Sequence, residues 1–256
     1  MASFEFNLKP RDVELINTSN RKIKTKIPVP ESLLLLEDLK KYESTNAREQ
    51  LPIIWEKAKN HQIFDRWGNA WIDFTSTIFV TNSGHGNDII IKRIKEQLDA
   101  PLLHSYYYPT KIKAQFLKKF ISMVPQKFEK AILLSGGTEA SERAMKIARI
   151  YGTRLNKKKN ILIAGVGNYH GKTMGAQMLS GQDPDKTWIG YHDPNIKHMP
   201  FPYPWVLEKN QIDGESLFYK HLDDLKSEGV DLERIAAFFV ESFQGWGAIF
   251  YPKEYI

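Results

Sequence analysis

The first half of the chain has the hydrophobic periodicity of amphipathic helices, interrupted by one hairpin. Apolar residues recur at helical spacing in three segments, which predicts helices over residues 31–44, 86–100 and 111–124. Two short β-type runs flank a polar turn within residues 62–74, which predicts a hairpin. The first thirty residues are expected to be extended, because Pro28 and Pro30 interrupt helix formation.

The second half alternates compact apolar strands with a helix. Continuous apolar runs predict three buried strands, over residues 130–135, 160–166 and 234–242. Residues 138–152 place small and apolar side chains on one stripe and end at Gly152, which predicts a helix. Such strands, alternating with helices, are typical of a mostly parallel sheet with helices on both faces, so we expect an α/β fold. The proline-rich and aromatic segment 193–205 is predicted to be an ordered surface loop.

The composition narrows the class of protein. The 256 residues are 42% hydrophobic and 26% charged, an ordinary globular balance, and no apolar run is long enough to cross a membrane. The N-terminus lacks a secretory pattern, and the absence of cysteine excludes disulfides, thiolate metal sites and cysteine nucleophiles. The net charge is +6, but the densest basic cluster, residues 154–160, is interpreted as a solvated loop. We therefore expect a cytoplasmic protein with no metal, nucleic-acid or membrane partner.

One segment resembles a phosphate-binding P-loop at its end, Gly171-Lys172-Thr173. That motif needs a glycine, four residues and then Gly-Lys-Ser/Thr, and the position it requires is Val166, with a glycine on either side. A shift of one residue redirects the backbone N–H groups that must converge on a phosphate. The following segment is also a poor helix former, so a nucleotide hydrolase is the weakest interpretation.

Three loops leave the carboxyl ends of predicted strands, where ligands gather in a parallel sheet. In the first, Gly136 and Gly137 let the backbone approach a ligand, and Thr138 stands where a helix cap is expected. Exposed helix N–H groups beside glycines make an anion site. The alternative for this loop is a plain strand-to-helix turn.

The other two loops display an aromatic ring, a histidine and a carboxylate. Tyr169 and His170 lie between glycines, and an aromatic ring at a strand end can lie flat on a planar ligand. Taken alone, His170 is more often a hydrogen-bonded structural residue than a catalyst. Glu241 follows four apolar residues, where a buried carboxylate needs a partner.

Together these stretches resemble the N-terminal part of a class III aminotransferase, a fold type I enzyme that uses pyridoxal phosphate. The matching stretches occur in the family's order from Pro28 to Pro252: FDRWGNAWIDFTS, VTNSGHGN, LLSGGTEASERAMKIAR, NYHGKTMGAQMLSG and FFVESFQGWGA. The resemblance, of the 4-aminobutyrate and ω-aminotransferase type, covers nearly the whole chain. It implies transfer of an amino group from an amino acid or ω-amine to a 2-oxo acid.

The resemblance also implies residue roles. Gly137 and Thr138, next to Gly136, would bind the cofactor phosphate through N–H groups and a hydroxyl. Tyr169, beside His170, would stack on the pyridine ring. Glu241 would belong to the polar shell around the cofactor. Ile78 and Tyr108 would line the substrate pocket, partly across a homodimer interface.

Two departures from the family pattern bear on the substrate. Ser242 follows the glutamate where proline is common, and Trp246 stands where many glutamate-using members have an acid that pairs with a movable arginine. A glutamate-type switch is therefore in doubt, and Trp246 is expected to border an apolar or differently gated substrate pocket.

The family's Schiff-base lysine and the aspartate that pairs with the pyridine nitrogen have no counterpart among these 256 residues. We therefore expect part of a longer enzyme or a truncated product without full activity. Residues 1–75 are expected to join a small domain and residues 76–256 to form most of the large cofactor domain. A racemase, epimerase or aminomutase on the same fold remains an alternative, as does a non-catalytic cofactor-binding module.

Overall fold

The computed structural model describes residues 6–43, 50–100, 102–155, 158–181, 183–245 and 247–256. The chain divides into two compact units, Met1–Phe116 and Leu117–Ile256, which are described separately below. The expected boundary after residue 75 falls inside the first unit and stays a prediction about the complete domains. Among the described residues, no helix is both long enough and apolar enough to span a membrane.

The first unit contains a small antiparallel sheet with strand order β1-β2-β5-β4-β3. Its strands are β1 (Ile16–Asn17), β2 (Lys22–Ile23), β3 (Lys57–Lys59), β4 (Gln62–Phe64) and β5 (Ala70–Ile72). The predicted hairpin is confirmed: β4 and β5 pair with Ile63 opposite Trp71. Its turn is held by Asp65, whose carboxylate accepts the Asn69 N–H at 2.8 Å. Both polar residues are buried, so their mutual hydrogen bonds offset the loss of water.

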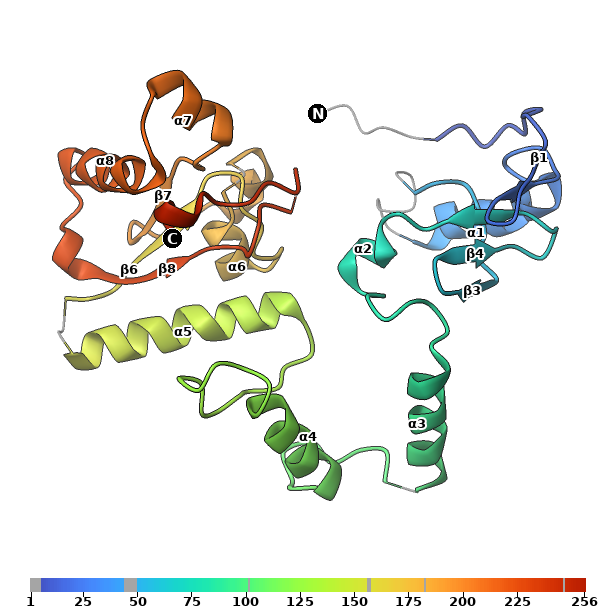
Figure 1. The fold of residues 1–256 in the computed structure, drawn as a ribbon, viewed down its shortest axis with the longest axis horizontal. Coiled ribbons are helices and arrows are strands. Elements are labelled where there is room, and N and C mark those ends of the chain that lie inside the picture. Colours follow the sequence, from blue (N-terminus) through green and yellow to red (C-terminus); the bar gives the residue numbers. More distant parts are fainter. Residues whose placement is uncertain (1–5, 44–49, 101, 156–157, 182, 246) are drawn as a thin grey trace. The chain divides into compact units, whose positions relative to one another are not determined.

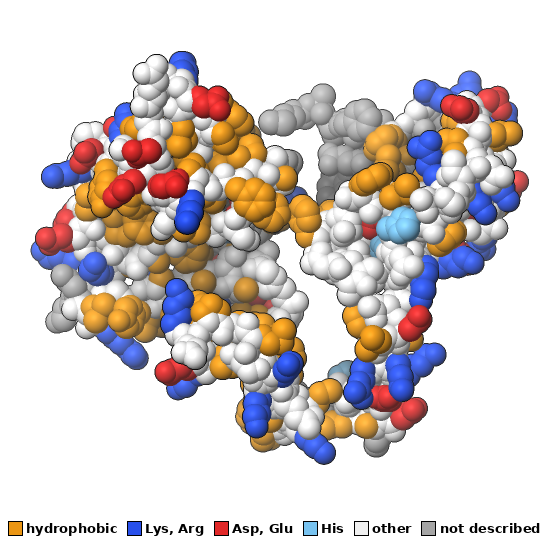
Figure 2. All heavy atoms as spheres, viewed as in Figure 1, with side chains coloured by type: hydrophobic (Ala, Val, Ile, Leu, Met, Phe, Trp, Pro, Cys, Tyr) orange, Lys and Arg blue, Asp and Glu red, His pale blue; other side chains and the backbone are white. Residues whose placement is uncertain are grey.

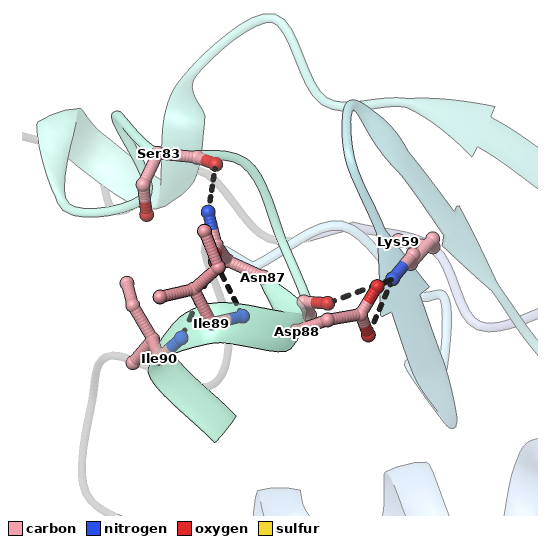
Figure 3. A network of polar contacts seen from close by, with 7 residues as sticks. Lys59, Ser83, Asn87, Asp88, Ile89 and Ile90 are labelled. Atoms are coloured by element: carbon pink, nitrogen blue, oxygen red, sulfur yellow. Dashed lines mark hydrogen bonds and ion pairs between the residues drawn. The ribbon is translucent and has the colours of Figure 1, made fainter. Parts of the chain in front are cut away.

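The three predicted helices of the first half are present as α1 (Leu33–Tyr42), α3 (Asp88–Asp99) and α4 (Lys111–Ile121). A short 3₁₀ turn, Pro30–Ser32, leads into α1. Figure 3 shows how α3 begins: the Asn87 side chain accepts the N–H groups of Ile89 and Ile90, and Lys59 contacts Asp88 at 2.8 Å. The apolar residues of α3 remain exposed, and Figure 2 shows hydrophobic side chains at the surface beside basic ones along this helix.

The segment after β5 has an unusual backbone. Four consecutive residues of α2 (Ser76–Phe79) have positive φ, between 48° and 66°, although none of them is glycine. Asp73 holds this turn, because its carboxylate accepts the N–H groups of Thr75 (2.9 Å) and Thr77 (3.0 Å) and lies 2.8 Å from Nε2 of His85.

The second unit is built on a parallel sheet with strand order β7-β6-β8. These strands are β6 (Ile161–Gly165), β7 (Ile196–Met199) and β8 (Ile235–Phe239). Central strand β6 is almost fully buried, and its residues alternate between two cores. The sheet is of the kind that the apolar runs predicted.

Helices cover both faces of this sheet. Ile161 and Ile163 face α8 (Gly214–Ser227), whose Leu217 and Leu225 pack against them. Leu162 and Ala164 face α5 (Gly137–Leu155) and α6 (Met174–Leu179). In Figure 1, α5 and α8 lie on opposite sides of β6 and β8. Within the described residues this unit also contains α7 (Pro204–Asn210) and the 3₁₀ turns Asp183–Ile189, Leu232–Arg234 and Lys253–Tyr255.

Two predictions about the second unit were wrong. Residues 130–135 form no strand in the described structure, and their leucines and isoleucine stay about half exposed. An apolar run becomes a strand only where a neighbouring strand accepts its backbone hydrogen bonds. Conversely, the segment 193–205 is not only a loop, because it contains β7 and the start of α7, and Met199 and Phe201 are buried.

Candidate functional site

Three segments of the second unit meet beyond the carboxyl ends of β6 and β8. They are the α5 start (residues 135–138), the Tyr169 loop (residues 166–173) after β6, and the Glu241 loop (residues 240–245) after β8. Because parallel strands end at the same edge of a sheet, the fold brings together loops that are distant in sequence. Side-chain contacts described below join each loop to the next.

The backbone N–H groups of Gly136, Gly137 and Thr138 at the α5 start pair with no acceptor in the part of the chain that the structure describes. The first N–H groups of a helix have no acceptor within the helix. Ser135, just before it, donates its N–H to the Glu139 carboxylate at 2.8 Å. A Cβ atom built on Gly136 or Gly137 would meet no atom within 4 Å. Among the described residues, the Thr138 hydroxyl has no hydrogen-bond partner. This end of α5 can therefore receive an anion.

The Tyr169 loop turns back tightly and packs on the α5 start. Gly167 has φ +80° and Gly171 has φ +132°, conformations that side chains disfavour. A Cβ atom on Gly171 would collide with the Thr138 side chain, so glycine permits this close contact. Asn168 is fully buried, and its amide donates to the Tyr251 hydroxyl at 3.0 Å. The loop therefore has a defined shape beside Thr138.

Tyr169 and His170 occupy different environments within this loop. The side chain of Tyr169 is 45% exposed, so its ring is free to contact a ligand. His170 donates its backbone N–H to Ser180 Oγ at 2.8 Å, and its ring Nε2 is buried with no hydrogen-bond partner among the described residues. Burial and the nearby His198 lower the pKa of His170 to about 4. The imidazole is therefore neutral at neutral pH.

Glu241 joins its own loop to the Tyr169 loop. Its carboxylate accepts the N–H of Tyr169 at 3.3 Å and the N–H of Gly245 at 3.4 Å. Burial raises the pKa of Glu241, and these two hydrogen bonds act against that rise. Gln244 reinforces the junction, because its amide donates to Tyr203 at 3.1 Å and lies against Gly167.

The P-loop interpretation is not favoured by the local hydrogen bonds. The segment predicted to be a poor helix former does form the short helix α6. However, the N–H groups of Gly175 and Ala176 at its start both donate to Glu142 at 3.0 Å. Those donors are occupied by a carboxylate and cannot cradle a phosphate in this conformation.

The site fits a ligand that combines a phosphate group with a planar ring. Open space and unpaired N–H groups at the α5 start suit the phosphate, and the exposed ring of Tyr169 suits the ring system. The buried, unpartnered ring nitrogen of His170 lies in the same loop. These are the features expected of Gly136, Gly137, Thr138, Tyr169, His170 and Glu241 as cofactor-binding residues, a role that stays a prediction.

Two of the three predicted substrate residues belong to the first unit. Ile78 is 78% exposed within α2, and the ring of Tyr108 stacks on Tyr107 at 4.5 Å; both belong to the first unit. Their place beside the site stays a prediction, and Trp246 lies outside the described residues. Sequence reasoning missed Glu142, Asn168 and Gln244, because their partners are 31 to 83 positions away in the chain.

Comparisons with known proteins agree with this architecture. The family model described as Aminotransferase class-III matches residues 43–256. Ornithine aminotransferase of Saccharomyces cerevisiae is 30% identical over 217 residues, which are 83% of this chain and 48% of that protein. Leucine/methionine racemase of Thermococcus litoralis is 29% identical over 209 residues, 79% of this chain and 45% of that protein.

A solved structure shows the same fold. Taurine:2-oxoglutarate aminotransferase from Bifidobacterium kashiwanohense, in complex with pyridoxal phosphate and glutamate, superimposes with a TM-score of 0.72 at 23% identity. The match covers 87% of this chain and 50% of that one. The fold is thus fold type I, and the chain spans about half the length of the curated relatives it matches. On the extent of the family match, the chain belongs to the class-III aminotransferases, a family that depends on pyridoxal phosphate.

Proposed function

We propose that the intact protein uses pyridoxal phosphate to transfer an amino group from an amino acid or ω-amine to a 2-oxo acid. The observation that supports this most is the junction of the α5 start, the Tyr169 loop and the Glu241 loop in a chain of this family. Pyridoxal phosphate, when bound, supplies the electron-withdrawing ring on which the chemistry of amino acids at the α-carbon depends.

The chain's own residues would bind and orient that group. The N–H groups of Gly136, Gly137 and Thr138, with the Thr138 hydroxyl, would hold the phosphate, since a helix start favours negative charge. Tyr169 would lie on the ring, and Glu241 would keep Tyr169 in place through the backbone hydrogen bond. His170, neutral at neutral pH, would place an uncharged ring next to the cofactor.

The test is a two-substrate assay of the intact protein with pyridoxal phosphate. A panel of α-amino acids and ω-amines is offered with 2-oxoglutarate or pyruvate, and the new amino acid is measured by chromatography. We expect product only when both donor and acceptor are present. Cofactor binding without turnover on any pair would instead favour the non-catalytic binding module.

A racemase is the second candidate, because two of the similar proteins carry that activity in their names, including alanine/serine racemase of Pyrococcus horikoshii at 28% identity. A racemase inverts the α-carbon and needs no 2-oxo acid. Chiral chromatography of a single L-amino acid, incubated with protein and cofactor alone, separates the two. Formation of the D-enantiomer without a 2-oxo acid would favour a racemase over an aminotransferase as the function.

We further propose that no lysine within Met1–Ile256 forms the covalent bond to the cofactor, since no lysine here matches the family's position. Borohydride reduction of the cofactor-bound intact protein, followed by peptide mass analysis, locates the modified lysine. One stoichiometric pyridoxyl-lysine within these residues would refute this proposal.

Two further expectations concern assembly and selectivity. We propose a cytoplasmic homodimer, consistent with the exposed apolar side chains of α3, and sedimentation of the intact protein would test the dimer.

We also propose that Ile78 and Tyr108 line the substrate pocket and that Trp246 disfavours acidic donors. Trp246→Glu should then shift the ratio of kcat/KM between acidic and neutral donors.

A further inference from the structure

One carboxylate ties the α5 start to the Tyr169 loop. Glu142 lies one helical turn after Thr138 on α5, and a single oxygen, Oε1, accepts three hydrogen bonds from the segment that begins α6. The donors are the Thr173 hydroxyl at 2.5 Å and the N–H groups of Gly175 and Ala176 at 3.0 Å. A Cβ atom on Gly175 would collide with this carboxylate, so the chain needs glycine there.

Glu142 accepts the hydrogen bonds that an N-cap side chain of α6 would otherwise accept. Thr173 stands at the N-cap of α6, yet its side chain makes no capping hydrogen bond to its own helix. Its hydroxyl donates to Glu142 instead, and the carboxylate takes over the two helix N–H groups. The start of α6 is therefore capped by a side chain of α5 and not by its own N-cap residue.

This contact fixes one end of the short segment that carries Tyr169. Only three residues separate Tyr169 from Thr173, and the short segment is held at several points. Tyr169 donates its N–H to Glu241, His170 donates its N–H to Ser180, and Gly171 rests against Thr138. Glu142 holds the far end of this segment through Thr173, so the segment is attached to α5 on both sides of Lys172.

We propose that Glu142 is a positioning residue, which sets the spacing between the ring-binding Tyr169 and the phosphate-binding α5 start. This inference rests on the proposed function. It differs from a purely stabilising role in one respect. Loss of Glu142 should weaken a ligand that contacts both Tyr169 and the α5 start, but not a ligand that contacts the α5 start alone.

The experiment compares two probes on the intact protein by calorimetry. Pyridoxamine phosphate has both the ring and the phosphate and no aldehyde, so it binds without a covalent bond; inorganic phosphate has the phosphate only. In Glu142→Ala the Kd for pyridoxamine phosphate should rise about tenfold or more, and the Kd for inorganic phosphate should change less than about threefold. Glu142→Gln keeps an acceptor oxygen and should give an intermediate rise, which preserves the test if the alanine variant does not fold.

A matched control and a double variant complete the test. Asp213→Ala removes another carboxylate that caps a helix, where it accepts the Ser216 N–H at 2.7 Å, and it should lower the melting temperature without changing either Kd. In a Tyr169→Leu background, Glu142→Gln should no longer affect pyridoxamine phosphate binding, because there is no ring contact left to position.

The outcomes separate the two proposals. If the unmodified protein does not bind pyridoxamine phosphate, the proposed function fails and this inference fails with it. If the unmodified protein binds and the Glu142 variants bind equally well, only the positioning role is overturned. Equal weakening of both probes, or equal effects with and without Tyr169, would likewise overturn it and leave Glu142 as a stabilising residue.

Discussion

Two short turns in this chain are each organised by one buried or half-buried carboxylate, and they differ in how the backbone reaches its shape. Glu142 collects donors from the end of the Tyr169 loop and the start of α6, and the positive φ angles of that loop fall on Gly167 and Gly171. Asp73 collects donors from the turn after β5, in which four consecutive residues other than glycine have positive φ. The first loop adopts a conformation that its sequence accepts at little cost.

The turn after β5 adopts a costly conformation. Each residue other than glycine in the left-handed region costs roughly 1–2 kcal/mol, so this turn depends on the interactions that hold it. Strain of this kind concentrates at functional sites, and Ile78, the proposed substrate-lining residue, lies within it. The comparison indicates that the Tyr169 loop reaches its shape with little backbone strain, while the strained turn that carries Ile78 is held in place by Asp73.

The largest effect should therefore follow removal of Asp73. Its side chain is only 3% exposed and contacts His85 and two threonines. Asp73→Ala removes the acceptor of the part-buried His85 ring and of the Thr75 and Thr77 N–H groups and releases the strained turn, so the intact protein should lose about 3 kcal/mol of unfolding free energy. Urea unfolding measures this loss. Asp12→Ala, which breaks an exposed pair with Lys26, should cost under about 0.5 kcal/mol; a similar cost for both would contradict the comparison.

The same network predicts a response to acid. Burial acts to raise the pKa of Asp73, but hydrogen bonds from His85, Thr75 and Thr77 outweigh it and lower the pKa from 3.8 to about 2. The stability that ionised Asp73 contributes is therefore fully present above pH 4 and is lost as the pH falls from about 4 to 2. Asp73→Asn should flatten the pH dependence of unfolding in that window. An unchanged acid profile in the variant would argue against the network.

Removing a glycine from the Tyr169 loop and adding one to the turn after β5 should change the free energy of unfolding in opposite directions. Gly171→Ala places a Cβ atom against Thr138 at φ +132° and should destabilise the protein by about 2 kcal/mol. Thr77→Gly relieves a residue at φ 53° and should stabilise it by about 0.5–1 kcal/mol. Thermal unfolding measures both. Thr153→Gly, the same change within the regular helix α5, should destabilise the protein. A loss of stability in Thr77→Gly as well would show that the backbone at Thr77 is not strained.

Local pattern was enough to predict much of the fold. The apolar runs of β6 and β8, the helix α5 and the hairpin around Asp65 and Asn69 all formed as predicted, because each depends on neighbours close in sequence or on burial alone. The apolar stripe expected on α5 is not its buried face, because Ile147 and Tyr151 are exposed whereas Met145 is buried. The strand at 130–135 was wrongly predicted and β7 was missed, because strand pairing is decided by distant segments. β7 is only four residues long and is followed directly by a proline-rich stretch.

The site shows the same division between local and distant causes. Glycines and the aromatic residue of the Tyr169 loop are visible in the sequence, and family resemblance assigned them roles. No role was assigned to Glu142 from the sequence, yet its carboxylate accepts hydrogen bonds at the start of a different helix, from Thr173, 31 positions away, and from Gly175. No residue near Glu142 in the sequence indicates that contact. Likewise, the hydrogen bond from Tyr169 to Glu241 spans 72 positions and follows from the parallel sheet, not from either motif.

We propose that the α5 start binds the phosphate of pyridoxal phosphate beside Tyr169, and one measurement tests this binding most directly. Thr138→Val keeps the shape of the side chain against Gly171 and removes only the hydroxyl. A hydrogen bond to a charged group is worth roughly 1.5–3 kcal/mol, so the Kd of the intact protein for pyridoxamine phosphate should rise about tenfold or more. Thr153→Val, on the same helix but away from the site, should leave the Kd unchanged. An unchanged Kd in Thr138→Val would take Thr138 out of the site and contradict the account.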